Sequence, residues 1–115
     1  EQRMAKHMAP VSVIQVPHHG SRHSSSLELV TVTDPAWAVI QSGRGNRYGH
    51  PHASVLERWN ATNVVETRVH GTIQFRTDGA HLSATQWVIG RGWVPLGGSQ
   101  KPRPPFDLWQ YKPGR

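Results

Sequence analysis

The 115-residue sequence contains no cysteine, which excludes a disulfide framework and any metal site built on thiolates. It also lacks an apolar run approaching the roughly 20 residues of a membrane-spanning helix, and residues 1–10 lack the apolar core of a signal peptide. Hydrophobic residues make up only 36% of the chain, beside 9 prolines and 11 glycines. We therefore expect a soluble chain that closes one small core, a single domain at most.

Acidic residues are also scarce, since 7 of them face 13 lysines and arginines and leave a formal charge of +6. Such a charge often indicates binding to nucleic acid or to an anionic membrane. The excess is concentrated in residues 91–115, where Asp107 is the only acidic residue. We interpret 1–90 as the domain and 91–115 as a basic tail, extended or disordered because it is rich in proline and glycine. A solvated terminus is the favoured role of this tail, and an anion-binding arm is the alternative.

The order of apolar runs predicts an α/β domain. The expected elements are a strand over 11–16, a short helix between the serines at 24–26 and Asp34, a strand over 37–40, a helix from Pro51 to about Asn60, a strand over 63–67, and two antiparallel strands over 72–76 and 82–89 around a turn at 77–79. The β-α-β-α-β order with short connections favours parallel strands with right-handed crossovers.

Two helical faces follow from the spacing of apolar residues. The first helix is expected to bury Leu27, Val30 and Thr31, and the second is expected to bury Val55, Leu56 and Trp59. Pro51 suits the first turn of the second helix, because its missing N–H would have no partner there.

The first chemically informative segment is Pro17-His18-His19-Gly20-Ser21, directly after the first predicted strand. Imidazole suits Zn, Mn or Fe, and adjacent histidines on an extended backbone point in opposite directions, so at most one can readily face a given metal. Ser21 can donate to an anion or cap the next helix. A catalytic zinc needs about three protein ligands, and the sequence contains no H-E-x-x-H or H-x-H-x-D-H cluster. Judged on these residues alone, a structural or surface role of the pair stands beside the metal-binding role.

The second segment is Asn46-Arg47-Tyr48-Gly49-His50-Pro51, which follows the second predicted strand. Arg47 offers a bidentate donor for phosphate, Asn46 an amide, and Tyr48 a stacking face and a hydroxyl. His50 can donate to an oxyanion or give a proton to a leaving group. The alternative is a turn in which asparagine and glycine only satisfy the backbone. Because both segments leave the carboxyl ends of parallel strands, we expect them to gather at one site.

Together these segments carry a family resemblance. The matching residues are Val16-Pro17-His18-His19-Gly20-Ser21, the serines at 24–26, Ala38-Val39-Ile40-Gln41-Ser42-Gly43, Asn46-Arg47-Tyr48-Gly49-His50-Pro51-His52, Val55-Leu56, Thr67 and Gly71-Thr72-Ile73. In this combination the chain resembles the carboxyl-terminal half of the metallo-β-lactamase-like domain of ComEC-type DNA-internalization competence proteins. The resemblance covers roughly residues 1–76, and residues 77–115 carry no motif of that family.

The resemblance implies an αββα sandwich, of which this chain would be the carboxyl-terminal half. It implies that His18 or His19 is a metal ligand, with His18 favoured, and that Ser21 and His50 serve catalysis. Asn46, Arg47, Tyr48 and His50 would contact the phosphate of DNA. The metal would be Mn or Zn, with most of its ligands in an upstream H-x-D-x-D-H segment that these residues do not contain.

The function implied by the resemblance is metal-dependent phosphodiester hydrolysis of the DNA strand that is not imported during transformation. The implied partners are single-stranded DNA, the rest of the parent domain, a transmembrane channel and competence DNA-receptor proteins, without an organic cofactor. The implied location is the extracytoplasmic, periplasmic face of the bacterial inner membrane. We expect the isolated chain to be inactive, with one sheet face uncovered until the rest of the domain or another chain completes it.

Two other functions are compatible with the residues. One is a non-catalytic DNA-guiding domain, in which Trp59, Trp87, Trp93 and Trp109 would stack on bases, although core and edge packing is the favoured role of these tryptophans. The other is a hydrolase of small phosphate esters, because a fold alone does not choose a substrate.

Overall fold

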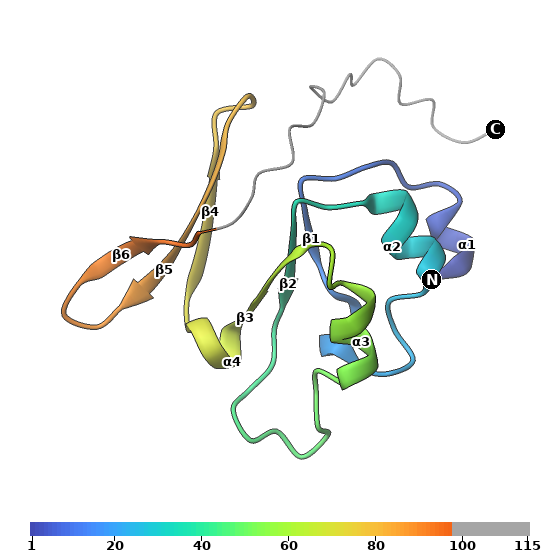
Figure 1. Ribbon diagram of the computed structural model, residues 1–115, viewed down its shortest axis with the longest axis horizontal. Coiled ribbons are helices and arrows are strands. Elements are labelled where there is room, and N and C mark those ends of the chain that lie inside the picture. The colour runs from blue at the N-terminus through green and yellow to red at the C-terminus, as the bar shows by residue number, and fades with distance from the viewer. Residues whose placement is uncertain (98–115) are drawn as a thin grey trace.

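The computed structural model describes residues 1–97 (Figure 1). Its elements in chain order are α1 (Gln2–Ala5), β1 (Val13–Gln15), the 3₁₀ turn η1 (Pro17–Gly20), α2 (Leu27–Thr33), β2 (Trp37–Ile40), α3 (Ala53–Arg58), β3 (Asn63–Glu66), α4 (Thr67–His70), β4 (Ile73–Thr77), β5 (Leu82–Val88) and β6 (Gly92–Pro95). Within residues 1–97, no helix has the length and apolar character needed to cross a bilayer. The result is a mixed α/β fold with two small sheets, and its assignment to the metallo-β-lactamase-like sandwich stays a prediction.

The first sheet is parallel, as the order of elements predicted. Its strand order is β1-β2-β3, and Trp37 of the central strand pairs with Val13 on one side and with Asn63 on the other. All three strands therefore end at the same edge of this parallel sheet, and the loops that leave them meet there.

One face of the parallel sheet packs against α2 and α3. The core on this face consists of Ile14, Val16, Leu29, Ala38, Ile40, Val55 and Trp59. The prediction that Val55 and Trp59 are buried is confirmed, since both are 0% exposed, and Leu56 packs against them in a half-buried position. The loops at the carboxyl edge of the sheet are held rigidly, because the inward side chains of the strands are fixed in one contiguous core.

The predicted buried face of α2 is wrong at Leu27 and Thr31 and confirmed at Val30, which packs against the core. Leu27 is 68% exposed and Thr31 is exposed, whereas Leu29 and Thr33 are buried beside the half-buried Val30. Thr33 tolerates burial because its Oγ1 donates to the Leu29 carbonyl at 2.6 Å. The helix is thus oriented with Leu29, rather than Leu27, toward the core.

The predicted start of the second helix is also wrong. The helix begins at Ala53, and His52 is its N-cap, with its ring Nδ1 accepting from Ser54 N at 3.3 Å. Pro51 is buried in the loop before the helix, where it packs against Gly20.

The second sheet is an antiparallel meander with the order β4-β5-β6. The predicted hairpin around residues 77–79 is confirmed, because Thr77 pairs with Leu82 and Ile73 pairs with Gln86. Neither η1 nor α4 was predicted, nor was β6, which lies inside the segment assigned to the basic tail. That segment therefore contributes a strand at Gly92–Pro95. The rest of the predicted tail, 98–115, including Trp109, lies outside the described residues.

A second core joins the two sheets. Trp37 and Val65 of the parallel sheet are buried with Ala36 and Ala84, and Phe75 of β4 meets Trp37 edge to face at 5.7 Å between ring centroids. The antiparallel sheet thus covers part of the face that we expected to be open. The remainder borders a cavity of about 710 Å³ between the parallel sheet and β4, lined by Val39, Phe75, Arg68 and neighbouring residues.

Candidate functional site

A pocket of about 490 Å³ opens at the carboxyl edge of the parallel sheet. The residues that line it are His19, Gln41, Ser42, Gly43, Asn46, Tyr48, His50 and Thr67. They come from the three loops that leave β1, β2 and β3, so the predicted gathering of the two segments at one place is confirmed. His19, Asn46, Tyr48 and His50 line the pocket, whereas His18, Ser21 and Arg47 are not among its lining residues.

The histidine pair is not extended, contrary to the prediction. His18 (φ 50°, ψ 41°) and His19 (φ 53°, ψ 23°) both adopt left-handed backbone conformations within η1. Two successive left-handed residues turn the chain sharply, which removes the alternation of side chains that an extended segment would have. The two imidazoles consequently contact different parts of the molecule.

His19 is fixed by one hydrogen bond to the neighbouring strand end. Its Nδ1 lies 2.7 Å from the carbonyl oxygen of Gln41. Because a carbonyl can only accept, Nδ1 carries the proton, and the neutral ring then keeps its lone pair on Nε2. A backbone carbonyl that holds one ring nitrogen is the usual support of a histidine metal ligand.

His18 is exposed and approaches the second loop. Its ring meets the His50 ring edge to face, with 5.9 Å between ring centroids. The pair therefore brings together one residue from each of the two predicted segments.

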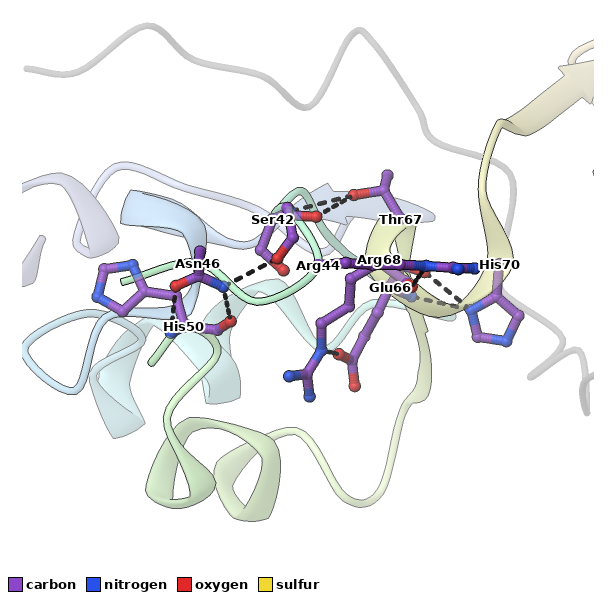
Figure 2. A network of polar contacts seen from close by, with 9 residues as sticks. Ser42, Arg44, Asn46, His50, Glu66, Thr67, Arg68 and His70 are labelled. Atoms are coloured by element: carbon purple, nitrogen blue, oxygen red, sulfur yellow. Dashed lines mark hydrogen bonds and ion pairs between the residues drawn. The ribbon is translucent and has the colours of Figure 1, made fainter. Parts of the chain in front are cut away.

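The loop before His50 is braced by the Asn46 side chain, as Figure 2 shows. The Asn46 amide donates to the Gly43 carbonyl at 3.0 Å and to the His50 carbonyl at 2.6 Å, and its Oδ1 accepts from His50 N at 2.9 Å. These bonds replace the missing regular secondary structure of residues 43–50. Asn46 thus positions His50, and its amide is already engaged within the loop.

Arg47, Tyr48 and His50 form a stack on the exposed side of the same loop. The Arg47 guanidinium carbon lies 4.9 Å from the centre of the Tyr48 ring, and its Nη2 donates to the Tyr48 hydroxyl at 2.7 Å. The Tyr48 ring is tilted by 30° against the His50 ring, at 5.7 Å between centroids. Tyr48 remains 65% exposed, so an aromatic face and a cation stand together at the mouth of the pocket.

The two loops touch through Gly20 and Pro51. A β-carbon added at Gly20, whose φ is +80°, would lie 2.6 Å from Pro51 Cβ. The Gly20 carbonyl also accepts from His52 N at 2.9 Å. Only glycine fits this contact, because the position requires both a left-handed backbone and the absence of a side chain.

Ser21 is buried behind the pocket. It is 5% exposed, its Oγ accepts from His23 N at 3.5 Å, and its carbonyl accepts from both the backbone N and the Oγ of Ser24 at 2.8 Å. These contacts place Ser21 in the turn that leads into α2. Its predicted catalytic role stays a prediction.

Four lining residues were not singled out as site residues. They are Gln41, Ser42, Gly43 and Thr67. Thr67 Oγ1 accepts from Ser42 N at 3.0 Å and donates to the Ser42 carbonyl at 3.1 Å, which ties the loop after β2 to the start of α4. The signal that could have found them is their position, since residues 41–43 begin the loop after β2 and Thr67 directly follows β3.

Metal-binding capacity is limited within the part of the chain that the structure describes. Among residues 1–97, no group of three or more His, Asp or Glu side chains is arranged to hold an ion. The histidines at the pocket therefore supply imidazole donors but not a full ligand set.

Comparison with known proteins gives related sequences but no family model and no solved structure that matches. The chain is 41% identical over 66 residues to ComE operon protein 3 of Bacillus subtilis and 40% identical over 76 residues to Recombination protein 2 of Haemophilus influenzae. It is 38% identical over 102 residues, 88% of its length, to Competence protein ComA of Neisseria gonorrhoeae. The chain is similar to a segment of competence proteins.

The similarity covers a small part of these relatives. The aligned region is 56% to 88% of this chain but only 8% to 13% of the three relatives, so the chain spans about a tenth of their length. The aligned identity supports the competence part of the predicted resemblance. The metallo-β-lactamase-like domain, the nuclease activity and the metal stay predictions.

Proposed function

We propose that this chain is a segment of a ComEC-like DNA-uptake protein of natural transformation, and that its pocket binds the phosphate backbone of DNA at a metal-dependent nuclease site. The observation that carries the proposal is the convergence of His19, His50 and the Arg47–Tyr48 stack at the carboxyl edge of one parallel sheet. The names of the relatives, two competence-related proteins and a recombination protein, support the biological setting.

Phosphate binding is the first function of the pocket residues. Arg47 is exposed and offers guanidinium donors beside the pocket, and His50 is one of the residues that line it. Contacts of this kind hold the backbone of a nucleic acid without reading bases, as sequence-independent uptake requires. Tyr48 can stack on an adjacent base because the residue is largely exposed.

The donor set fits a divalent ion in part. We propose that His19 binds Mn²⁺ or Zn²⁺ through Nε2, because the Gln41 carbonyl fixes the proton on Nδ1. This differs from the sequence-based preference for His18, whose ring contacts His50 instead. The remaining ligands would come from outside these 115 residues. The bound ion would lower the pKa of a water molecule and neutralise charge on the scissile phosphate.

His50 is the proposed proton donor to the leaving oxygen. Asn46 holds its backbone from both sides, and the rings of His18 and Tyr48 restrict its imidazole. A general acid needs such restraint, because proton transfer requires hydrogen-bond distance to the leaving atom. Ser21 would act by shaping the turn that carries the histidines rather than by touching the substrate.

The setting of this activity is proposed on the same basis. The longer protein would present the segment on the periplasmic face of the inner membrane, beside the channel that imports one strand. Its partners would be single-stranded DNA, the rest of the parent domain, the transmembrane channel and competence DNA-receptor proteins.

The decisive experiment measures Mn²⁺-dependent cleavage of single-stranded DNA by the longer protein that carries this segment. We expect His19→Ala and His50→Ala to abolish cleavage, His18→Ala to reduce it less, and His7→Ala, an exposed histidine away from the pocket, to leave it unchanged. Circular dichroism of each variant checks the fold. Unchanged cleavage in both His19→Ala and His50→Ala would show that the pocket is not the nuclease site.

A second candidate function is DNA guiding without cleavage. The exposed Arg47–Tyr48 stack favours it, because it fits a bound strand whether or not a reaction follows. In that case the longer protein would bind single-stranded DNA with steep salt dependence and no metal requirement, and no metal among Mn²⁺, Zn²⁺ and Mg²⁺ would support cleavage.

A further inference from the structure

The antiparallel sheet has two faces of opposite character. Its register places Trp87 directly opposite Trp93, and Thr85 opposite Pro95, on one face. The other face carries Ala84, which packs with the buried Trp37 of the parallel sheet. Because side chains alternate along a strand, the tryptophan face is directed away from the core.

The two tryptophans form an exposed cross-strand pair on this outward face. Their rings meet edge to face with centroids 5.4 Å apart, and Trp87 is 49% exposed and Trp93 44% exposed. The β5–β6 hairpin that carries them extends away from the parallel sheet (Figure 1). Two large aromatic side chains left side by side in solvent are typical of a binding surface.

The surroundings of the pair are polar and cationic. Arg76 is opposite Ser83 and so shares the outward face, and Gln74, opposite Thr85, lies between it and the tryptophans. Arg91 lies exposed in the turn between β5 and β6. The only acidic residue from 72 to 97 is Asp78, whose carboxylate already accepts from the backbone N–H groups of Ala80 and His81.

We propose that this outward face binds single-stranded nucleic acid, with bases stacked on Trp87 and Trp93 and phosphates held by Arg76 and Arg91. An aromatic platform beside cations is the arrangement that binds single strands without sequence preference. An apolar protein partner is less well matched, because Arg76, Gln74 and Ser83 share the face with the tryptophans and Pro95. This surface is separate from the pocket at the parallel sheet and needs no metal ion.

The test uses the 115-residue chain and a fluorescein-labelled oligothymidylate of about ten nucleotides, in EDTA and at low salt. Fluorescence anisotropy is expected to show that Trp87→Ala and Trp93→Ala each weaken binding about tenfold. Trp87→Tyr should keep most of the affinity because it retains a stacking ring. Leu27→Ala, which removes a still more exposed apolar side chain on α2, is the control and should change nothing.

An abasic oligonucleotide of the same length separates stacking from phosphate binding. We expect it to bind at least tenfold more weakly than oligothymidylate, and we expect Arg76→Gln and Arg91→Gln each to reduce the salt slope by about one. Equal binding of the abasic strand, or unchanged binding in the folded Trp87→Ala variant, would overturn the proposal and leave a protein partner as the occupant. If a tryptophan variant does not fold, the abasic strand and the arginine variants still decide. Because no metal is present, this result is independent of the cleavage assay.

Discussion

The contact between Gly20 and Pro51 makes a quantitative prediction for Gly20→Ala. The new β-carbon would lie 2.6 Å from Pro51 Cβ and 3.0 Å from Pro51 Cα, which is closer than carbon atoms approach without displacement. A left-handed backbone costs an alanine about 1–2 kcal/mol, and overpacking of a tight site costs about 1–3 kcal/mol more. We therefore expect the free energy of unfolding to fall by about 2–5 kcal/mol.

A matched control separates these two causes. Gly49 lies in the other loop with a similar φ of +67°, but a β-carbon added there meets no atom within 4 Å. Gly49→Ala should therefore cost only the backbone term of about 1–2 kcal/mol. Urea denaturation followed by tryptophan fluorescence measures both variants at unchanged m-value. If Gly20→Ala and Gly49→Ala lose the same stability within about 0.5 kcal/mol, the two loops are not locked by this contact.

The same substitution should also affect the pocket. Pro51 directly follows His50, and Gly20 directly follows His19. Displacing the two contact residues therefore shifts the two histidines of the pocket. The longer protein carrying Gly20→Ala is thus expected to lose cleavage at temperatures where it remains folded, whereas Gly49→Ala should lose less.

Three further predictions concern contacts elsewhere in the fold. The Arg58 guanidinium donates to three backbone carbonyls of the loop before α2, so Arg58→Ala should lower the free energy of unfolding by about 2 kcal/mol. Arg58→Lys should recover less than half of this loss, and urea denaturation measures both variants. Thr67→Val should cost about 1–2 kcal/mol through its lost bonds to Ser42, and Thr67→Ser should restore stability in the same assay. The backbone N–H groups of His81 and Ala80 hold the pKa of Asp78 well below its ordinary value. The ionised Asp78 carboxylate therefore contributes its full stabilisation above the ordinary pKa of about 3.9. This contribution is lost as the pH falls toward the lowered pKa. In urea denaturation at a series of pH values, the difference in free energy of unfolding between the native chain and Asp78→Asn should narrow below about pH 4.

The parallel strands and the meander could be predicted because their signals are local. Apolar runs that contain Val and Ile marked β1 and β2, and alternation around a Thr77-Asp78-Gly79 turn marked β4 and β5. The orientation of α2 could not be predicted in this way. Leu29 and Thr33 face the core because the sheet lies on that side, and the hydroxyl of Thr33 finds its acceptor only once the helix has formed.

The candidate site was predicted in its location but not in its geometry. Strand ends indicated that the loops carrying His19 and His50 would meet, whereas the left-handed turn at His18 and His19 has no local sequence signal. Asn46 shows the same limit. The sequence indicated its amide as a phosphate ligand, and only the structure shows that this amide donates to two carbonyls of its own loop. The strand β6 was not predicted because two of its paired positions are Gly92 and Pro95, and glycine and proline are uncommon in strands.

The two sheets differ in how far apart along the chain their partners lie. Trp87 pairs with Trp93 across a short turn, whereas Val13 must reach Trp37 and Trp37 must reach Asn63 through intervening helices. Closing long loops costs entropy before any contact repays it, so we expect the meander to form early and the parallel sheet later. The pocket depends on all three parallel strands and is then among the last features to be assembled. In a protein made on the ribosome, the antiparallel meander emerges after the parallel sheet whose face it partly covers through Phe75 and Ala84, which ties the formation of the site to the synthesis of the residues that follow it.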